Sequence, residues 1–216
     1  MLEKMADFFS ARLAGYDEHM LQNIVGAGEF YPYTASLLPR SKGSRILDLG
    51  CGTGLELEYY FPLCPTANVT GIDLCADMLQ ALIKKFPDKS ITTHCESYFT
   101  ADFGSECLDA AVSVESLHHF TAEEKLPLYK KLYRAIVPDG SFILTDYFAA
   151  DDEEEAALRQ EYLRLTQELP QNEFYHFDTP LTVQHETKTL QKAGFSVEIL
   201  RNWGATYTLM AHKEQV

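Results

Sequence analysis

The spacing of apolar residues divides the chain into parts with different periodicity. Over residues 1–43 apolar side chains recur at helical spacing, with Met5, Phe8 and Phe9 on one stripe, which predicts an amphipathic helical cover. Over residues 44–149 short apolar runs alternate with helical repeats, and this rhythm indicates a parallel sheet with helices on both faces. The expected strands of this part are 45–49, 68–73, 91–95, 108–114 and 141–147.

The pattern changes after the fifth expected strand. Residues 150–180 contain an acidic run followed by a helical apolar stripe, and we interpret them as an insertion that could form a lid over a substrate. Residues 181–216 predict a helix that ends at Gly194 and two last strands joined as a hairpin. We therefore expect a single α/β domain over 1–216, with a doubly wound, mostly parallel seven-stranded sheet and a C-terminal antiparallel hairpin.

A glycine-rich loop follows the first expected strand. Residues Asp48 to Gly54 read D-L-G-C-G-T-G, and a helix is expected from Leu55. Glycines at alternate positions let the backbone turn sharply and let a ligand approach the N–H groups that open the helix. The dinucleotide fingerprint is G-x-G-x-x-G, whereas this loop is G-x-G-x-G. The loop resembles motif I of the class I S-adenosylmethionine (SAM)-dependent methyltransferases of the small-molecule type. That resemblance implies SAM as cofactor and S-adenosylhomocysteine as product.

Two carboxylates belong to the expected ligand site. Asp48 stands at the mouth of the first strand and is expected to face a ligand on the loop. Asp73 closes the second strand, at about the interval at which nucleotide-binding folds place a ribose-binding acid. The alternative for Asp73 is an N-cap of the next helix. Leu74 and Met78 could form an apolar wall for an adenine ring, with core packing as the alternative.

Further cofactor contacts follow from the resemblance. It implies that Glu96 and Ser97 contact the adenine amino group and that the backbone of Val114 and Glu115 lies beside the methionine part of SAM. Tyr16, from the helical cover, is expected to close over the cofactor. The predicted cofactor-binding set is Asp48, Gly50, Cys51, Gly52, Gly54, Asp73, Leu74, Met78, Glu96, Ser97, Val114 and Tyr16.

The residues after the fourth strand are the candidates for acid–base chemistry. Glu115, His118 and His119 lie at the carboxyl end of that strand, where open α/β sheets bind ligands. A hydroxyl or amine acceptor would need a base, and a histidine has the pKa best matched to neutral pH. Adjacent histidines point in different directions, so at most one is expected to face the substrate. No metal site is expected, because no cysteine or carboxylate lies at ligand spacing nearby.

The charge of the chain bears on its partners. The net charge of −14 disfavours nucleic acid, because nucleic-acid affinity comes largely from cationic side chains on phosphates. No apolar run is long enough to span a bilayer, so no membrane partner is expected. Five cysteines without paired spacing and an acidic N-terminus without a secretory signal indicate a cytoplasmic protein. We expect a small-molecule acceptor, and the cover or the lid could form a homodimer.

Three other functions fit parts of the pattern. The chain could bind SAM as a regulatory or interaction protein without methyl transfer, since an intact glycine loop predicts binding and not turnover. An NAD(P)-dependent oxidoreductase would share the strand, loop and acid, but the shortened glycine spacing and the hairpin disfavour it. A tRNA-modifying enzyme is disfavoured by the acidic charge.

Overall fold

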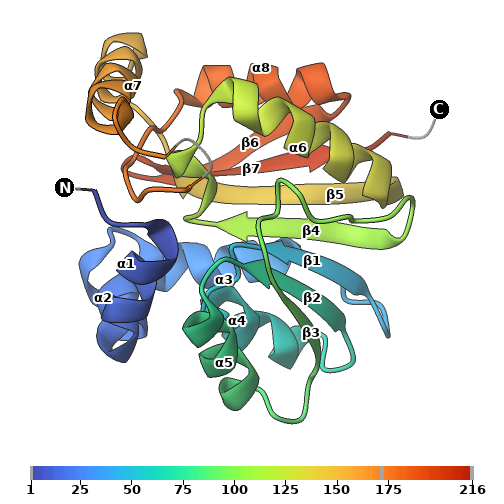
Figure 1. Cartoon of the computed structure of the whole chain (residues 1–216). Helices are drawn as coiled ribbons and strands as arrows, with labels where there is room; N and C mark the ends of the chain where they lie inside the picture. Colours follow the sequence, from blue (N-terminus) through green and yellow to red (C-terminus); the bar gives the residue numbers. More distant parts are fainter. Residues whose placement is uncertain (1, 171–172, 215–216) are drawn as a thin grey trace.

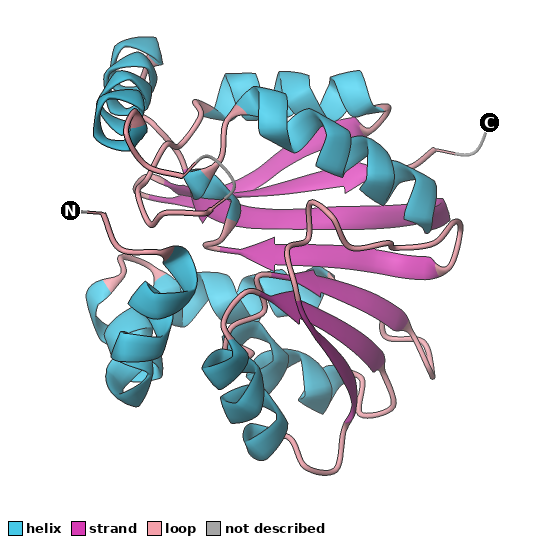
Figure 2. Ribbon diagram, in the orientation of Figure 1, coloured by secondary structure: helices cyan, strands magenta, loops and turns pink. Residues whose placement is uncertain are grey.

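The central element of the computed structural model is one seven-stranded sheet with the order β3-β2-β1-β4-β5-β7-β6 (Figures 1 and 2). The structure describes residues 2–170 and 173–214, so the parts of the expected domain at 1, 171–172 and 215–216 lie outside the described residues. Strands β1 to β5 pair in parallel, and β7 runs antiparallel to β5 and β6. The expected fold class is therefore confirmed. The strands are β1 Arg45–Leu49, β2 Asn68–Asp73, β3 Ser90–Cys95, β4 Leu108–Val114, β5 Ile136–Tyr147, β6 Ser196–Trp203 and β7 Thr206–His212.

Two of the predicted strand boundaries need correction. β5 begins at Ile136 and not at residue 141, because residues 137–140 form a bulge within the strand and the register passes from Leu108–Ile136 to Ala110–Ser141. β6 continues to Trp203, so the hairpin connection consists of Gly204 and the residue after it.

Helices cover both faces of the sheet and the edge formed by the carboxyl ends of its parallel strands. They are α1 Met5–Arg12, α2 Tyr16–Asn23, α3 Ala27–Leu37, α4 Leu55–Leu63, α5 Ala76–Lys85, α6 Ala122–Ala135, α7 Asp152–Thr166 and α8 Val183–Ala193, with 3₁₀ turns η1 Leu13–Gly15 and η2 Leu117–His119. One apolar core holds side chains of α3, α4 and α5, and a second holds side chains of α6 and α8. α1 and α2 lie beside the strand ends (left in Figure 1). Among the described residues, no helix is both long and apolar enough to cross a membrane.

Two carboxylates, those of Asp17 and Glu186, attach helices to their neighbours. Asp17 of α2 pairs with Lys85 of α5 at 2.6 Å and accepts a hydrogen bond from Thr53 of the glycine loop, so the cover is attached to that loop. Lys125 of α6 forms a buried ion pair with Glu186 of α8 at 2.6 Å between Nζ and Oε2. The second pair joins the two helices of one face.

Candidate functional site

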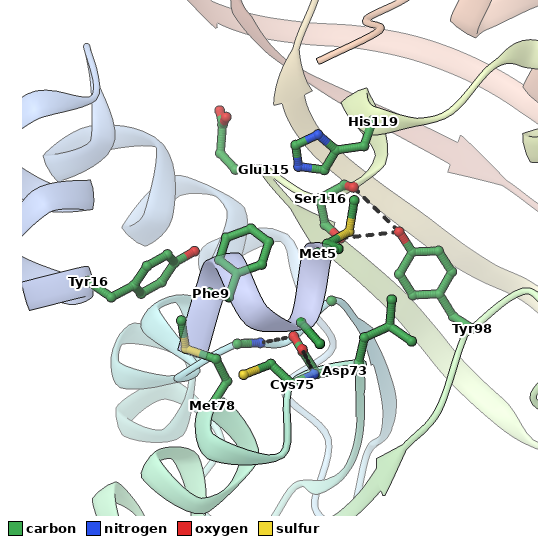
Figure 3. A pocket seen from close by; sticks show the side chains of 14 residues that line it. Met5, Phe9, Tyr16, Asp73, Cys75, Met78, Tyr98, Glu115, Ser116 and His119 are labelled. Carbon is green, nitrogen blue, oxygen red and sulfur yellow. Dashed lines mark hydrogen bonds between the residues drawn. The ribbon is translucent and has the colours of Figure 1, made fainter. Parts of the chain in front are cut away.

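Two adjoining pockets open where the parallel strands end. The smaller one, called here the glycine-loop pocket, lies between the loop after β1 and helix α1 (Figure 3). It is lined by Met5, Ala6, Phe9, Tyr16, Gly50, Gly52, Asp73, Leu74, Cys75, Met78, Tyr98, Glu115, Ser116 and His119. Its free volume is only about 40 Å³, because Met5 and Phe9 of α1 project into it.

The glycine loop brings backbone close to the pocket. Gly50 has a φ of +68°, and a Cβ added there would lie 1.9 Å from the hydroxyl oxygen of Ser116. Only glycine fits this position, both because of the left-handed backbone and because of the close approach. Gly52 also has a positive φ of 49°, and its N–H group donates to the carboxylate of Asp73.

Asp73 connects the glycine loop to the loop after β2. Its Oδ2 accepts from the N–H of Gly52 at 2.9 Å and its Oδ1 accepts from the N–H of Cys75 at 2.8 Å (Figure 3). Helix α5 has Cys75 as its N-cap and no side-chain cap, so the N-cap alternative for Asp73 is wrong. Burial raises the pKa of the Asp73 carboxyl, although both backbone hydrogen bonds act in the opposite direction.

The structure brings part of the predicted cofactor set to this pocket. The members that line it are Tyr16, Gly50, Gly52, Asp73, Leu74 and Met78. Glu115 and His119, which were predicted for chemistry, also line it. Their roles in binding or catalysis stay predictions.

Other predicted members lie elsewhere. Asp48 is 1% exposed and does not line the pocket, so the expectation that it faces a ligand directly is wrong. Burial, then the charge of Glu56 and a hydrogen bond with its carboxyl group, raise the pKa of Asp48 well above its usual value. Cys51 and Val114 are buried and also do not line the pocket.

Gly54 and the pair after β3 also lie away from the pocket lining. Gly54 precedes α4 in a left-handed conformation, and a Cβ there would meet Leu82 at 2.4 Å, so its role is in packing. Glu96 is exposed and faces His94 at 3.6 Å, and Ser97 does not line the pocket either. The strand ends at Cys95, so both residues follow it as expected, but their side chains do not reach this cavity.

Sequence reasoning missed several lining residues. Tyr98 and Ser116 face each other across the pocket, with the Tyr98 hydroxyl 3.4 Å from the Ser116 hydroxyl (Figure 3). Met5 and Phe9 were assigned only to an apolar stripe. That stripe was the one available signal, and it does not distinguish packing on the sheet from closure over a ligand site.

The second cavity, called here the large pocket, has a volume of about 1040 Å³ and shares Phe9, Tyr16, Glu115 and His119 with the first. Its apolar part comes mainly from the cover and the hairpin. Its polar end contains Glu115, His118, His119 and Asp178. The full lining is Phe8, Phe9, Arg12, Gly15, Tyr16, His19, Met20, Asn23, Ile24, Val25, Glu115, His118, His119, Tyr147, His176, Asp178, Trp203, Gly204, Ala205 and Thr206. Of the described residues of the expected lid, His176 and Asp178 after α7 line the pocket and α7 itself does not.

The two histidines both face the large pocket, which corrects the expectation that at most one would. They form the 3₁₀ turn η2, and their rings lie 4.0 Å apart. The Nδ1 atom of His118 lies 2.6 Å from Oδ1 of Asp146, the last residue but one of β5. The Nδ1 atom of His119 lies 3.1 Å from Oδ1 of Asp178. Carboxylates therefore do lie beside the histidines. The reason given above for expecting no metal site, that no carboxylate is nearby, is wrong.

Burial and the local charges give these groups different pKa values. Burial acts to lower the pKa of His118, but the charge and hydrogen bond of Asp146 outweigh it and raise the pKa to about 9. Burial and then the charge of His118 lower the pKa of His119 to about 4. Burial and then the charge of Asp146 raise the pKa of Glu115 to about 7. Neither histidine keeps the near-neutral pKa that was expected, whereas Glu115 acquires it.

The chain is similar to known methyltransferases in sequence. Residues 46–140 match the methyltransferase domain family. Phosphoethanolamine N-methyltransferase of Plasmodium falciparum is 26% identical over 114 residues, which are 52% of this chain and 42% of that protein. The tRNA (carboxymethyluridine(34)-5-O)-methyltransferase of Arabidopsis thaliana is 29% identical over 130 residues, 59% of this chain and 30% of that protein. The matches thus span less than half the length of these relatives.

A solved structure has the same fold. The S-adenosylmethionine-dependent methyltransferase from Mesorhizobium loti superposes with a TM-score of 0.63 at 19% sequence identity, covering 89% of this chain and 99% of that one. At this identity the likeness concerns the arrangement of strands and helices alone.

Proposed function

We propose that this chain, which belongs to the class I methyltransferases, transfers a methyl group from SAM to a small-molecule acceptor in the large pocket. The family inferred from the glycine loop is confirmed by the domain matched over residues 46–140. The activity of the whole protein, its cofactor and its acceptor are the proposal.

One observation carries the proposal: the two pockets share a wall. Phe9, Tyr16, Glu115 and His119 line both of them. A cofactor on the glycine loop and an acceptor in the large pocket would therefore meet at these residues. Holding two reactants in contact and in line contributes up to about 7–11 kcal/mol to lowering a barrier in favourable cases.

The residues of the glycine-loop pocket fit SAM. The loop presents backbone without side chains at Gly50 and Gly52, and Asp73 places a carboxylate on the pocket wall. We assign Asp73 to the ribose hydroxyls, and Leu74 and Met78 to the adenine face. When bound, SAM supplies a methyl group that its sulfonium already activates.

Cofactor entry requires helix α1 to shift. The free volume of about 40 Å³ is far below the roughly 300 Å³ or more of typical small-ligand sites. Met5 and Phe9 occupy the space between Asp73 and His119 (Figure 3). We therefore assign α1 the role of a cover that opens for the cofactor and closes on it with Phe9 and Tyr16.

Three groups are available to receive a proton from an acceptor. Glu115 and His119 line both pockets, while His118 lines the large pocket alone. We assign the proton to Glu115, because it stands on the shared wall and accepts a hydrogen bond only from Thr206 among the described residues, at 3.0 Å. Its φ of +49° is unusual for a non-glycine residue, and such strained backbone is found at functional sites.

The acceptor is proposed to be a small, partly apolar molecule. The large pocket is enclosed by aromatic and aliphatic side chains at one end and by ionisable groups at the other. Of the two relatives described above, one is named for phosphoethanolamine and the other for tRNA. The net charge of −14 favours the small molecule over nucleic acid for this chain.

The first test is calorimetric titration of the protein with S-adenosylhomocysteine, with NAD as a parallel control. We expect S-adenosylhomocysteine alone to bind and Asp73→Ala to weaken it. Binding of NAD, or of neither ligand by the folded protein, would refute the proposal. Release of S-adenosylhomocysteine from SAM in the presence of candidate acceptors then separates an enzyme from a SAM-binding regulatory protein, which would bind without turnover.

A further inference from the structure

Three metal-ligand side chains converge at the polar end of the large pocket. One nitrogen of His118, one nitrogen of His119 and one carboxylate oxygen of Asp178 lie within 4.8 Å of one another. Oδ1 of Asp178 is 3.6 Å from Nε2 of His118 and 3.1 Å from Nδ1 of His119. Two ligands at the usual 2.0–2.1 Å from a tetrahedral zinc ion stand about 3.4 Å apart, so these separations fit a shared ion.

The oxygen at the centre of this cluster is buried between two imidazoles. Oδ1 of Asp178 has Nδ1 of His119 at 3.1 Å and Nε2 of His118 at 3.6 Å as its neighbours. Nδ1 of His119 also lies at hydrogen-bond distance from the carbonyl of Phe177, at 3.2 Å, so the carboxylate and the carbonyl compete for one ring nitrogen. A buried carboxylate oxygen that shares its donor is poorly satisfied, and a cation between it and the imidazoles would satisfy it.

A second carboxylate, that of Asp146, orients the imidazole ring of His118. Oδ1 of Asp146 accepts from Nδ1 of His118 at 2.6 Å, and the same carboxylate accepts from the N–H groups of Leu117 at 2.8 Å and Tyr147 at 2.9 Å. This arrangement fixes the ring so that Nε2 faces Asp178. Metal-ligating histidines almost always have such a carboxylate or carbonyl on the other ring nitrogen.

We propose that His118, His119 and Asp178 form a binding site for a divalent first-row transition-metal ion such as Zn²⁺. Two imidazoles and one carboxylate are the ligand set such ions prefer, whereas Mg²⁺ prefers oxygen ligands throughout. All three side chains line the large pocket, so an ion held by them would border that space. The open positions therefore face the space assigned to the acceptor.

The position of the ion gives it a role that rests on the proposed function. An acceptor with an oxygen or nitrogen donor would bind the open face of the metal and be held beside Glu115 and the shared wall. Metal binding lowers the pKa of a coordinated hydroxyl, so such an acceptor would lose its proton more easily. The inference thus names the acceptor class as molecules that carry a metal-binding donor next to the methylated atom.

The test is titration of the purified protein with Co²⁺, followed by its visible absorption, and with Zn²⁺ by calorimetry. The exposed Cys95, which lies beside His94 and Glu96, is first replaced by serine to remove an alternative surface ligand. Asp178→Asn is then compared in this background with Asp152→Asn. Asp152 is the matched control, because it is an exposed aspartate 3.9 Å from His185 and outside both pockets.

We expect one equivalent of Co²⁺ to bind, Mg²⁺ not to compete, and Asp152→Asn to leave binding unchanged. Loss of an outer partner weakens metal binding about 10–100-fold, so loss of a ligand in Asp178→Asn should weaken it by at least about 100-fold. Absence of Co²⁺ binding in the Cys95→Ser protein, or equal binding with and without Asp178, overturns the proposal. Titration of S-adenosylhomocysteine on the same samples verifies folding and separates this outcome from failure of the proposed function.

Discussion

Replacing Asp73 tests two roles of its carboxylate, one in the stability of the fold and one in ligand binding. The two oxygens of Asp73 each accept a backbone N–H group, at 2.9 Å from Gly52 and 2.8 Å from Cys75. Alanine removes both acceptors. Asparagine retains one carbonyl oxygen, so it can satisfy one of the two N–H groups and leaves the shape of the site nearly unchanged.

The size of the effect follows from those two bonds. A hydrogen bond to a charged group contributes about 1.5–3 kcal/mol, but burial of this carboxylate opposes its ionised form, so the lower end applies. We expect Asp73→Ala to lower the free energy of unfolding by about 2–4 kcal/mol and Asp73→Asn by about half as much. Because the folded pKa of Asp73 is raised, wild-type stability falls as pH rises through it, and the wild-type advantage over asparagine should shrink with rising pH.

The assay combines urea unfolding with calorimetric binding of S-adenosylhomocysteine. Loss of ribose contacts to a carboxylate should weaken binding about 10- to 100-fold in Asp73→Ala. The exposed Asp88, replaced by alanine, is the control for loss of one negative charge in this part of the fold. If Asp73→Ala is no less stable and binds no more weakly than Asp88→Ala, both roles assigned to Asp73 are wrong.

Three further substitutions test other contacts. Gly50→Ala should lower the unfolding free energy by at least about 2 kcal/mol and abolish S-adenosylhomocysteine binding, because it adds left-handed strain and a clash with Ser116; unchanged thermal melting and calorimetry would contradict this. Lys125→Met should lower the unfolding free energy by about 3–5 kcal/mol, as measured by urea unfolding, because the buried Glu186 carboxylate loses its cation and keeps, within the described part of the chain, only the hydrogen bond from Tyr129. Glu56→Gln should stabilise the protein more at pH 8 than at pH 5, because burial raises the Glu56 pKa and wild-type stability falls as pH rises through it; a difference independent of pH would disprove that reading.

The fold was largely predictable because its signals are local. β1, β2 and β4 begin and end where the apolar runs do, and the capping box at Thr121 and Glu124 starts α6 as its sequence indicates. The bulge in β5 was missed because a Pro-Asp-Gly sequence reads as a turn. Those residues lie within the strand because Ile136 pairs with Leu108 of β4 before them, and Ser141 pairs with Ala110 of β4 and His212 of β7 after them.

The site was predictable only where it is built from strand ends. Asp73 and Glu115 lie on the pockets because the carboxyl ends of parallel strands meet at one edge of the sheet. Asp178 could not be assigned from sequence, since it is 59 residues from His119 and approaches it through a segment that follows α7. Asp48 was assigned to the pocket by its place on the strand, but its side chain is buried beside Glu56.

The segment after α7 that contains Asp178 also forms backbone hydrogen bonds with the helical cover. The carbonyl of Phe174 accepts from the N–H of Met5 at 2.9 Å, and the N–H of His176 donates to the carbonyl of Glu3 at 3.0 Å. The N–H of Thr179 donates to the carbonyl of His118 at 2.8 Å, so one short stretch is attached both to α1 and to the histidine turn. A shift of α1 that admits a cofactor must therefore break these contacts or carry the stretch with it. If the stretch moves with α1, the histidine–aspartate cluster moves as well, and the resulting coupling between the two binding equilibria must be reciprocal.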